Sequence, residues 1–250
     1  MDLPVTALCA TDSLGENLVQ LGNGGCPPLL DITSGPAGQG DWCKETTSNA
    51  IREIAAMPSV HTVLLAADWS LYVTGARLNG DYDASWQIRH LPPEEPGKSN
   101  ANVFNAQLRK TLDFLVNAGK NVVVLKQTPA LKNFDPVGCL TKRPITFSQK
   151  NITCSISAVD AKKYLREYES ILDNILIDYP NVKSLDPFDI FFKFDTFSLD
   201  RQCIISKDNI PLFRDRTPHL SYFGSVYVAR ELMHTLLANG YTPVSPALAK

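Results

Sequence analysis

The sequence predicts an α/β fold, in which a mostly parallel sheet is covered by helices on both faces. Short runs rich in Val, Ile and Leu alternate along the chain with longer segments of helical period. Crossover connections join strands that alternate with helices, and such connections build parallel sheets. The chain has 250 residues, 44% hydrophobic and 20% charged, as in an ordinary globular protein. Because we find no internal repeat or linker, we expect a single domain over residues 1–250.

Five apolar segments have the length and composition of strands. They are short, rich in β-branched residues and bounded by polar or Gly-containing stretches. The predicted strands are Val5–Ala10, Asn17–Gly22, Thr62–Ala67, Asn121–Gln127 and Asn181–Asp186.

The longer segments carry apolar residues at helical spacing. The predicted helices are Asn102–Asn117, Ala158–Tyr179, Ser221–Ala238 and, with fewer apolar repeats, Thr46–Met57. Gly119 lies just past the first of them, where a glycine commonly ends a helix. Long loops follow the predicted strands, and parallel sheets gather functional residues past the carboxyl ends of their strands.

The cysteines indicate an oxidising compartment. Cys26 and Cys43 bracket a loop rich in Gly and Pro, and Cys139 and Cys154 bracket another. Disulfides that close such loops are typical of exported proteins, so we predict the Cys26–Cys43 and Cys139–Cys154 bonds. The alternative is six unpaired and mostly buried thiols. Neither pair has the C-x-x-C spacing of a zinc site, and we expect no bound metal.

The charge and hydropathy of the chain limit the kinds of partner and membrane segment that we expect. The formal net charge of −2 gives no electrostatic reason to expect nucleic acid. No apolar run approaches the roughly 20 residues that cross a bilayer, and the first residues do not resemble a signal peptide. Cysteines that suit disulfides, without an export signal, indicate a piece of a larger exported protein. Cys9 and Cys203 have no assigned partner.

An Asp and a His lie on one short polar loop near the end of the chain. Residues 213–225 predict a strand end, then this loop, then a helix with Ser221 as its N-cap. Asp215 can accept a hydrogen bond from His219, and a carboxylate in that position orients a base that deprotonates a serine. The alternative is an exposed ion-pairing Asp beside a His at a helix start.

Several motifs together resemble a known family. They are Gly24-Gly25-Cys26-Pro27-Pro28-Leu29, the strand and Trp-x-x-Tyr turn of residues 63–72, the helix end, strand and proline of residues 119–129, and Asp215…His219-Leu220-Ser221…Gly224. Over residues 17–238 the chain resembles the extracytoplasmic SGNH domain fused to bacterial membrane acyltransferases of the acyltransferase type 3 family. The resemblance implies a three-layer α/β/α, flavodoxin-like fold. It also implies that the first strand and helix and an N-terminal membrane domain are missing here.

The resemblance implies acyl transfer, usually of acetyl, to or from hydroxyls of cell-surface glycans by Ser/His/Asp chemistry. His219 is then the base and Asp215 its orienting carboxylate, although the family spacing is Asp-x-x-His and Pro218 adds a residue. No cofactor is needed. The implied substrates are a glycan and an acyl donor, the implied partner is a membrane acyltransferase domain, and the implied location is the periplasmic face of the bacterial membrane.

The serine nucleophile has two possible positions. Thr11-Asp12-Ser13 resembles the family's Gly-Asp-Ser block, which makes Ser13 a candidate. Only ten residues separate Ser13 from Gly24, too few for the helix and strand that the family places there. We therefore expect Asn17–Gly22 to be the second strand and the serine to lie upstream of Met1.

Two residues are candidates for the hydrogen-bond donors of the oxyanion hole, and each has an alternative interpretation. Trp69 occupies the position of the family's Asn, and its indole N–H either donates a hydrogen bond to substrate or belongs to a packed side chain. The backbone N–H of Gly25 is a second candidate, and the alternative is that Gly25 only permits a tight turn. The rival to an enzyme is a non-catalytic glycan-binding or scaffolding domain that lacks a working serine.

Overall fold

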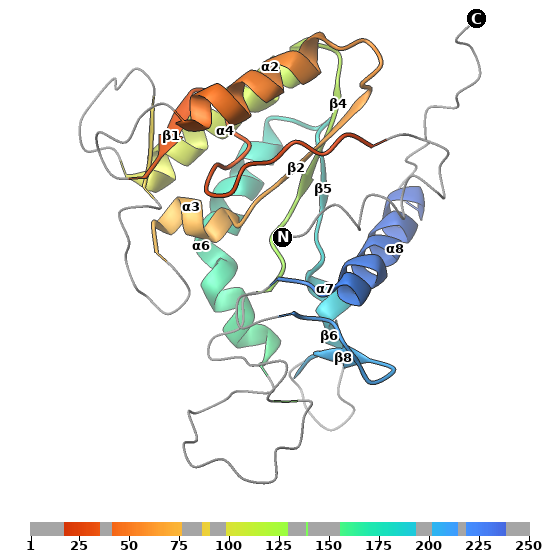
Figure 1. The fold of residues 1–250 in the computed structure, drawn as a ribbon. Helices are drawn as coiled ribbons and strands as arrows, with labels where there is room; N and C mark the ends of the chain where they lie inside the picture. The colour runs from red at the N-terminus through yellow and green to blue at the C-terminus, as the bar shows by residue number, and fades with distance from the viewer. Residues whose placement is uncertain are drawn as a thin grey trace, which may run out of the picture. The chain divides into compact units, whose positions relative to one another are not determined.

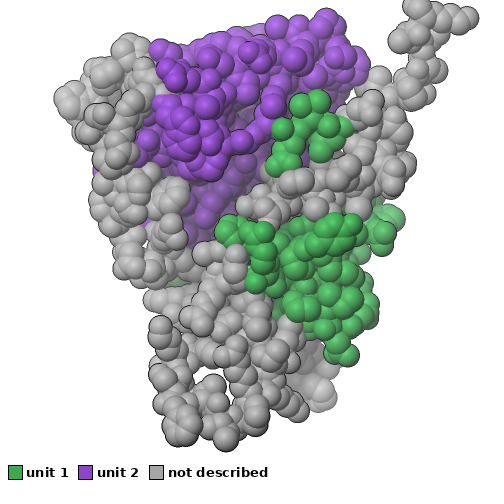
Figure 2. Space-filling view, in the orientation of Figure 1, with its two compact units in different colours: residues 1–20, 128–163, 186–250 green, residues 21–127, 164–185 purple. Residues whose placement is uncertain are grey.

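The computed structural model describes residues 18–35, 42–76, 87–90, 99–129, 139, 156–193, 202–214 and 219–238. The chain divides into two compact units (Figure 2). Unit 1 comprises residues 1–20, 128–163 and 186–250, and unit 2 comprises residues 21–127 and 164–185. The assignment of one domain to residues 1–250 stays a prediction.

A parallel three-stranded sheet forms the centre of unit 2 (Figure 1). Its strands are β2 (Thr62–Ala66), β4 (Asn121–Leu125) and β5 (Lys183–Leu185), in the order β2-β4-β5. Thr62 lies opposite Asn121, and Val123 lies opposite Lys183. The residues of β4 from Val122 on are all buried, as expected of the middle strand of a covered parallel sheet. The predicted α/β fold with a parallel sheet is confirmed.

Helix α4 (Asn100–Asn117) shows why this sequence forms these elements. The side chain of Ser99 caps its first turn by accepting a hydrogen bond from the Asn102 N–H. Its buried face carries Phe104, Leu108, Leu112 and Leu115 at helical spacing. Gly119 follows the helix with a φ of +74°, as predicted for its end. This helix packs against α2 (Asn49–Ala56), α3 (Trp69–Thr74) and β4.

The remaining unit 2 helices follow the predicted pattern with shifted ends. The predicted helix Thr46–Met57 is a π-helical turn, η1 (Lys44–Ser48), that continues into α2. Helix α6 spans Ala158–Ile177 and enters unit 2 at Tyr164. Its buried residues Leu165, Tyr168, Leu172 and Ile175 recur on one face.

One predicted strand is wrong. Residues 18–22 of the segment Asn17–Gly22 have no strand pairing, and Leu18, Val19 and Leu21 are exposed. The segment is apolar enough to resemble a strand, but none of the described strands pairs with residues 18–22. The described strand nearest in sequence is β1 (Ile32–Ser34), which is buried and pairs antiparallel with β3 (Ile88–His90). The predicted strand Val5–Ala10 lies outside the described residues.

Unit 1 contains short strand pairs and the last helix. Helix α7 (Phe188–Phe191) leads into β6 (Phe192–Lys193), which pairs antiparallel with β7 (Gln202–Cys203). Strands β8 (Ser206–Lys207) and β9 (Ile210–Pro211) form a hairpin whose turn residues, Asp208 and Asn209, have positive φ. Helix α8 spans Tyr222–Ala238. None of the helices in the described segments combines the length and the apolar character that a membrane span requires.

Candidate functional site

His219 lies at the end of a loop whose two sides are hydrogen-bonded to each other. Phe213 and Leu220 form an antiparallel bridge. The Arg214 N–H donates a 2.9 Å hydrogen bond to the carbonyl oxygen of His219. The side chain of His219 is half-buried, whereas Phe213 and Leu220 are buried. Asp215 follows Arg214 in the sequence and lies outside the described residues. The backbone on both sides of the loop is therefore fixed.

The start of α8 holds this turn in place. The Ser221 hydroxyl accepts a 3.0 Å hydrogen bond from the Gly224 N–H, which confirms Ser221 as the N-cap, and donates one of 2.6 Å to the Pro211 carbonyl. The Ser221 N–H donates to the carbonyl oxygen of Leu212. A β-carbon on Gly224 would lie 2.0 Å from that same oxygen, so only glycine fits there. The motif His-Leu-Ser…Gly is a strand-to-helix connection that presents His219.

Gly25 and Trp69, the two predicted oxyanion donors, belong to unit 2. Gly25 has a φ of +85°, a conformation that favours glycine, and the Cys26 N–H donates to the Asn23 carbonyl across the same turn. The turn therefore requires a backbone conformation that glycine adopts readily. A donor role for its N–H stays a prediction.

The structure gives Trp69 a packing role. Its indole is fully buried and meets the ring of Phe104 edge to face, with 5.8 Å between ring centroids. Its Nε1–H donates a 2.8 Å hydrogen bond to the carbonyl oxygen of Leu125, at the end of β4. Because an indole has one N–H, this bond leaves none for a substrate in the structure as it stands.

The Cys26–Cys43 disulfide is present, with 5.4 Å between the two α-carbons. Cys139 is also in a disulfide. Its predicted partner Cys154 lies outside the described residues, so that pairing stays a prediction. Cys203 is free and buried, and burial raises the pKa of its thiol to about 12. That thiol stays protonated and unreactive at neutral pH.

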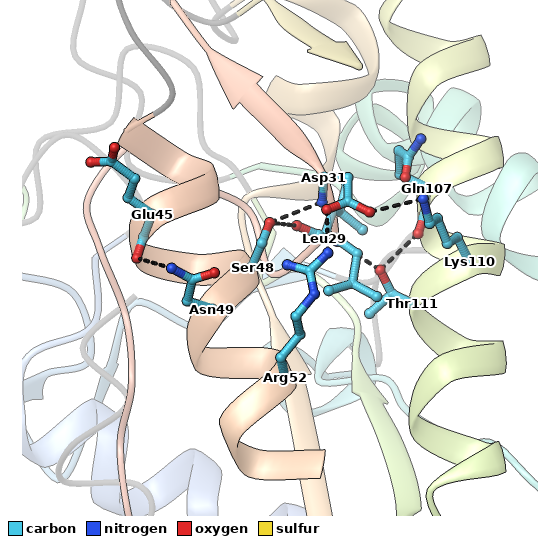
Figure 3. A network of polar contacts seen from close by, with 10 residues as sticks. Leu29, Asp31, Glu45, Ser48, Asn49, Arg52, Gln107, Lys110 and Thr111 are labelled. Atoms are coloured by element: carbon cyan, nitrogen blue, oxygen red, sulfur yellow. Dashed lines mark hydrogen bonds and ion pairs between the residues drawn. The ribbon is translucent and has the colours of Figure 1, made fainter. Parts of the chain in front are cut away.

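A polar network anchors the segment that follows Cys26 (Figure 3). The Asp31 carboxylate pairs with Arg52 of α2 and with Lys110 of α4, whose Nζ is 2.8 Å away. Burial raises the pKa of Asp31, but the hydrogen bonds and charges of Lys110 and Arg52 outweigh it and hold that pKa below its ordinary value. Asp31 is therefore ionised at neutral pH.

Backbone hydrogen bonds complete this anchor. Asp31 has a φ of +52°, and its N–H donates a 2.9 Å hydrogen bond to the Ser48 hydroxyl (Figure 3). The Leu30 N–H donates to the Thr111 hydroxyl, also at 2.9 Å. These bonds fix residues 29–31 between α2 and α4, and with the disulfide they anchor the segment that follows the Gly25 turn.

Comparison with known proteins identifies one family. The family model for the SGNH domain that is fused to AT3 domains matches residues 10–234. Comparisons with curated proteins and with solved structures give no match. In the described segments no cluster of His, Cys, Asp and Glu could hold a metal ion. The match spans most of the chain and includes both the parallel sheet and the turn that carries His219, so the chain belongs to the family of SGNH domains fused to AT3 domains.

Proposed function

We propose that this chain transfers an acyl group, acetyl in the first instance, to or from hydroxyls of cell-surface glycans. The observation that carries the proposal is the turn at His219. Its backbone is held by the Phe213–Leu220 bridge, by the Ser221 cap and by the close approach at Gly224. A general base works best on a fixed backbone, and this connection fixes the backbone of His219 in a chain of the family of SGNH domains fused to AT3 domains.

The proposed chemistry uses His219 as the base and Asp215 as its orienting carboxylate. A serine Oγ attacks the carbonyl carbon of the acyl donor while His219 takes the hydroxyl proton. The leaving group departs with that proton, which leaves an acyl-serine. A glycan hydroxyl then attacks the acyl-serine and gives its proton to His219, which returns it to the serine. Asp215 directly follows Arg214, whose N–H bonds to the His219 carbonyl, and this closeness in the chain supports the pair.

The nucleophile is Ser13 or a serine upstream of Met1. The position upstream of Met1 requires Asn17–Gly22 to be the family's second strand, and residues 18–22 are not in a strand. The family match also begins at residue 10, ahead of Ser13. Both observations favour keeping Ser13 as the candidate within the chain, although it lies outside the described residues.

The fusion that defines the family supports a membrane partner. A fused AT3 domain would deliver the acyl group, and this domain would act on the glycan at the periplasmic face of the membrane. The Cys26–Cys43 disulfide is consistent with that oxidising location.

Labelling with a serine-directed fluorophosphonate tests the proposal. Labelling of the chain at Ser13, located by mass spectrometry and lost in both Ser13→Ala and His219→Ala, assigns the nucleophile and the base. Labelling that needs an upstream Gly-Asp-Ser segment assigns the nucleophile to that segment. If neither chain is labelled and neither hydrolyses p-nitrophenyl acetate, the non-catalytic glycan-binding alternative holds instead.

A further inference from the structure

Two polar side chains at the carboxyl edge of the unit 2 sheet have hydrogen-bonding atoms that the described residues do not use. Ser70 follows β2 and Gln127 follows β4, and their exposed fractions are 1% and 2%. Within the described part of the chain, the Ser70 hydroxyl and the Gln127 Nε2 have no hydrogen-bond partner. Parallel sheets bind their ligands outside the carboxyl ends of their strands, which is where both atoms lie.

Hydrogen bonds fix the Gln127 amide and the backbone of both residues. The Ser70 N–H donates a 2.8 Å hydrogen bond to the Gln127 Oε1. The Gln127 N–H donates to the Tyr168 hydroxyl at 3.2 Å. Because Oε1 must accept from Ser70, the amide cannot be flipped, and Nε2 with its two protons points elsewhere.

Leaving such donors unused is costly. A buried donor without a partner destabilises a fold by about 1–3 kcal/mol, and native proteins contain few of them. Binding sites are where stability is given up in this way, because donors that are already aimed and shielded from water stabilise a developing negative charge strongly. The neighbouring Trp69 cannot serve, because its N–H is bonded to Leu125.

We infer that the Ser70 hydroxyl and the Gln127 Nε2 donate hydrogen bonds to the carbonyl oxygen of the acyl group. This inference rests on the proposed function for the identity of the ligand. Ser70 lies in the first turn of α3, and Asp68, which directly precedes this helix, is exposed. Burial, with the Asp68 carboxylate nearby, raises the pKa of both Tyr72 and Tyr164, so two protonated phenols lie near the same carboxylate. This edge of the sheet is polar, as a site for an ester requires.

Acetate is the probe, because it carries the carbonyl-type oxygens and the methyl group of the expected acyl group. Acetate is titrated into the ¹⁵N-labelled chain while the side-chain amide signals of Gln127 are followed by NMR, after assignment through their loss in Gln127→Glu. We expect a saturable shift of these signals. Ser70→Ala should raise the acetate Kd about three- to tenfold, the worth of one hydrogen bond.

A matched control separates this site from unused hydroxyls in general. The Thr47 hydroxyl is also buried without a partner in the described residues, but it lies on η1. Thr47→Val should leave the acetate Kd unchanged. Because the Ser70 hydroxyl makes no hydrogen bond to the described residues, Ser70→Ala should unfold at the same urea concentration as wild type or a higher one.

Three results would overturn the inference: no saturable shift at Gln127, an equal effect of Thr47→Val on the Kd, or a lower urea midpoint for Ser70→Ala. The last would show that the hydroxyl already has a partner, such as a structural water. None of these readouts involves His219 or the nucleophile. A negative acetate titration would therefore not contradict the proposed function. A negative labelling experiment would not contradict the role of Ser70 and Gln127 as donors.

Discussion

Replacing Gly224 with alanine tests whether α8 packs directly against the backbone of Leu212, next to the turn that carries His219. The β-carbon of alanine would lie 2.0 Å from the carbonyl oxygen of Leu212, 2.8 Å from its carbonyl carbon and 3.0 Å from its α-carbon. All three atoms belong to the backbone, so no side-chain rotation relieves the clash. Leu212 also accepts the Ser221 N–H bond, and the separation needed for a methyl group would stretch that bond.

Two opposing effects set the magnitude. Alanine is favoured over glycine inside a helix by about 1 kcal/mol. Overpacking costs about 1–3 kcal/mol, and a contact this close to rigid backbone belongs at the upper end of that range. The clash therefore outweighs the gain in helix propensity, and we expect Gly224→Ala to lower the free energy of unfolding by about 2 kcal/mol.

Urea unfolding followed by circular dichroism measures this change. Tryptophan fluorescence is the wrong probe, because all three tryptophans lie in unit 2 and Gly224 lies in unit 1. The matched control is Gly24→Ala, since a β-carbon on Gly24 meets no atom within 4 Å. The control should unfold as wild type does. A Gly224→Ala variant as stable as wild type, or more stable, would refute the close approach of α8 to Leu212.

Three further predictions concern unit 2. Asp31→Asn should cost on the order of 1 kcal/mol at neutral pH. The pKa of Asp31 is lower in the folded than in the unfolded protein, so its carboxylate stabilises the fold above the unfolded-state pKa, and this stabilisation is lost as the pH falls. The difference in unfolding free energy between Asp31→Asn and wild type, measured in urea titrations, should therefore shrink below about pH 4. Reducing Cys26–Cys43, or replacing Cys43 with serine, should lower the free energy of unfolding by about 3 kcal/mol, and an unchanged urea midpoint after reduction would contradict this. Trp69→Phe removes the donor to the Leu125 carbonyl and should cost about 1–3 kcal/mol by the same assay, whereas no loss would mean that the bond contributes nothing.

The sequence predicted best those helices and strands that are long enough to show an apolar pattern. Helix α4 was predicted from its apolar spacing and from Gly119, and the structure moves only its start, from Asn102 to Asn100. Strands β2 and β4 were found because both read as continuous apolar runs, which are typical of strands in parallel sheets. Pairs such as β1 with β3 were missed, since three-residue strands show no period and their partners lie far apart in sequence. Asn17–Gly22 failed for the opposite reason, because apolar character without a pairing partner does not make a strand.

The candidate site was only partly accessible from sequence. Family resemblance indicated His219 and Asp215, and a capping pattern indicated Ser221, which the structure confirms as the cap. The unused donors of Ser70 and Gln127 could not be found, because no sequence pattern shows which polar atoms the fold leaves unbonded. Their positions just past two predicted strands were the one available signal.

Histidine NMR tests directly whether Asp215 pairs with His219. The chain contains four His, so ¹⁵N-histidine labelling gives few ring signals, and those of His219 are assigned by their loss in His219→Gln. An imidazole oriented by a carboxylate carries its proton on Nδ1, and this tautomer has distinct nitrogen shifts. We predict that His219 has the Nδ1–H tautomer and loses it in Asp215→Asn while the other three His are unchanged. His219 signals that show the Nε2–H tautomer, or that do not respond to Asp215→Asn, would contradict it.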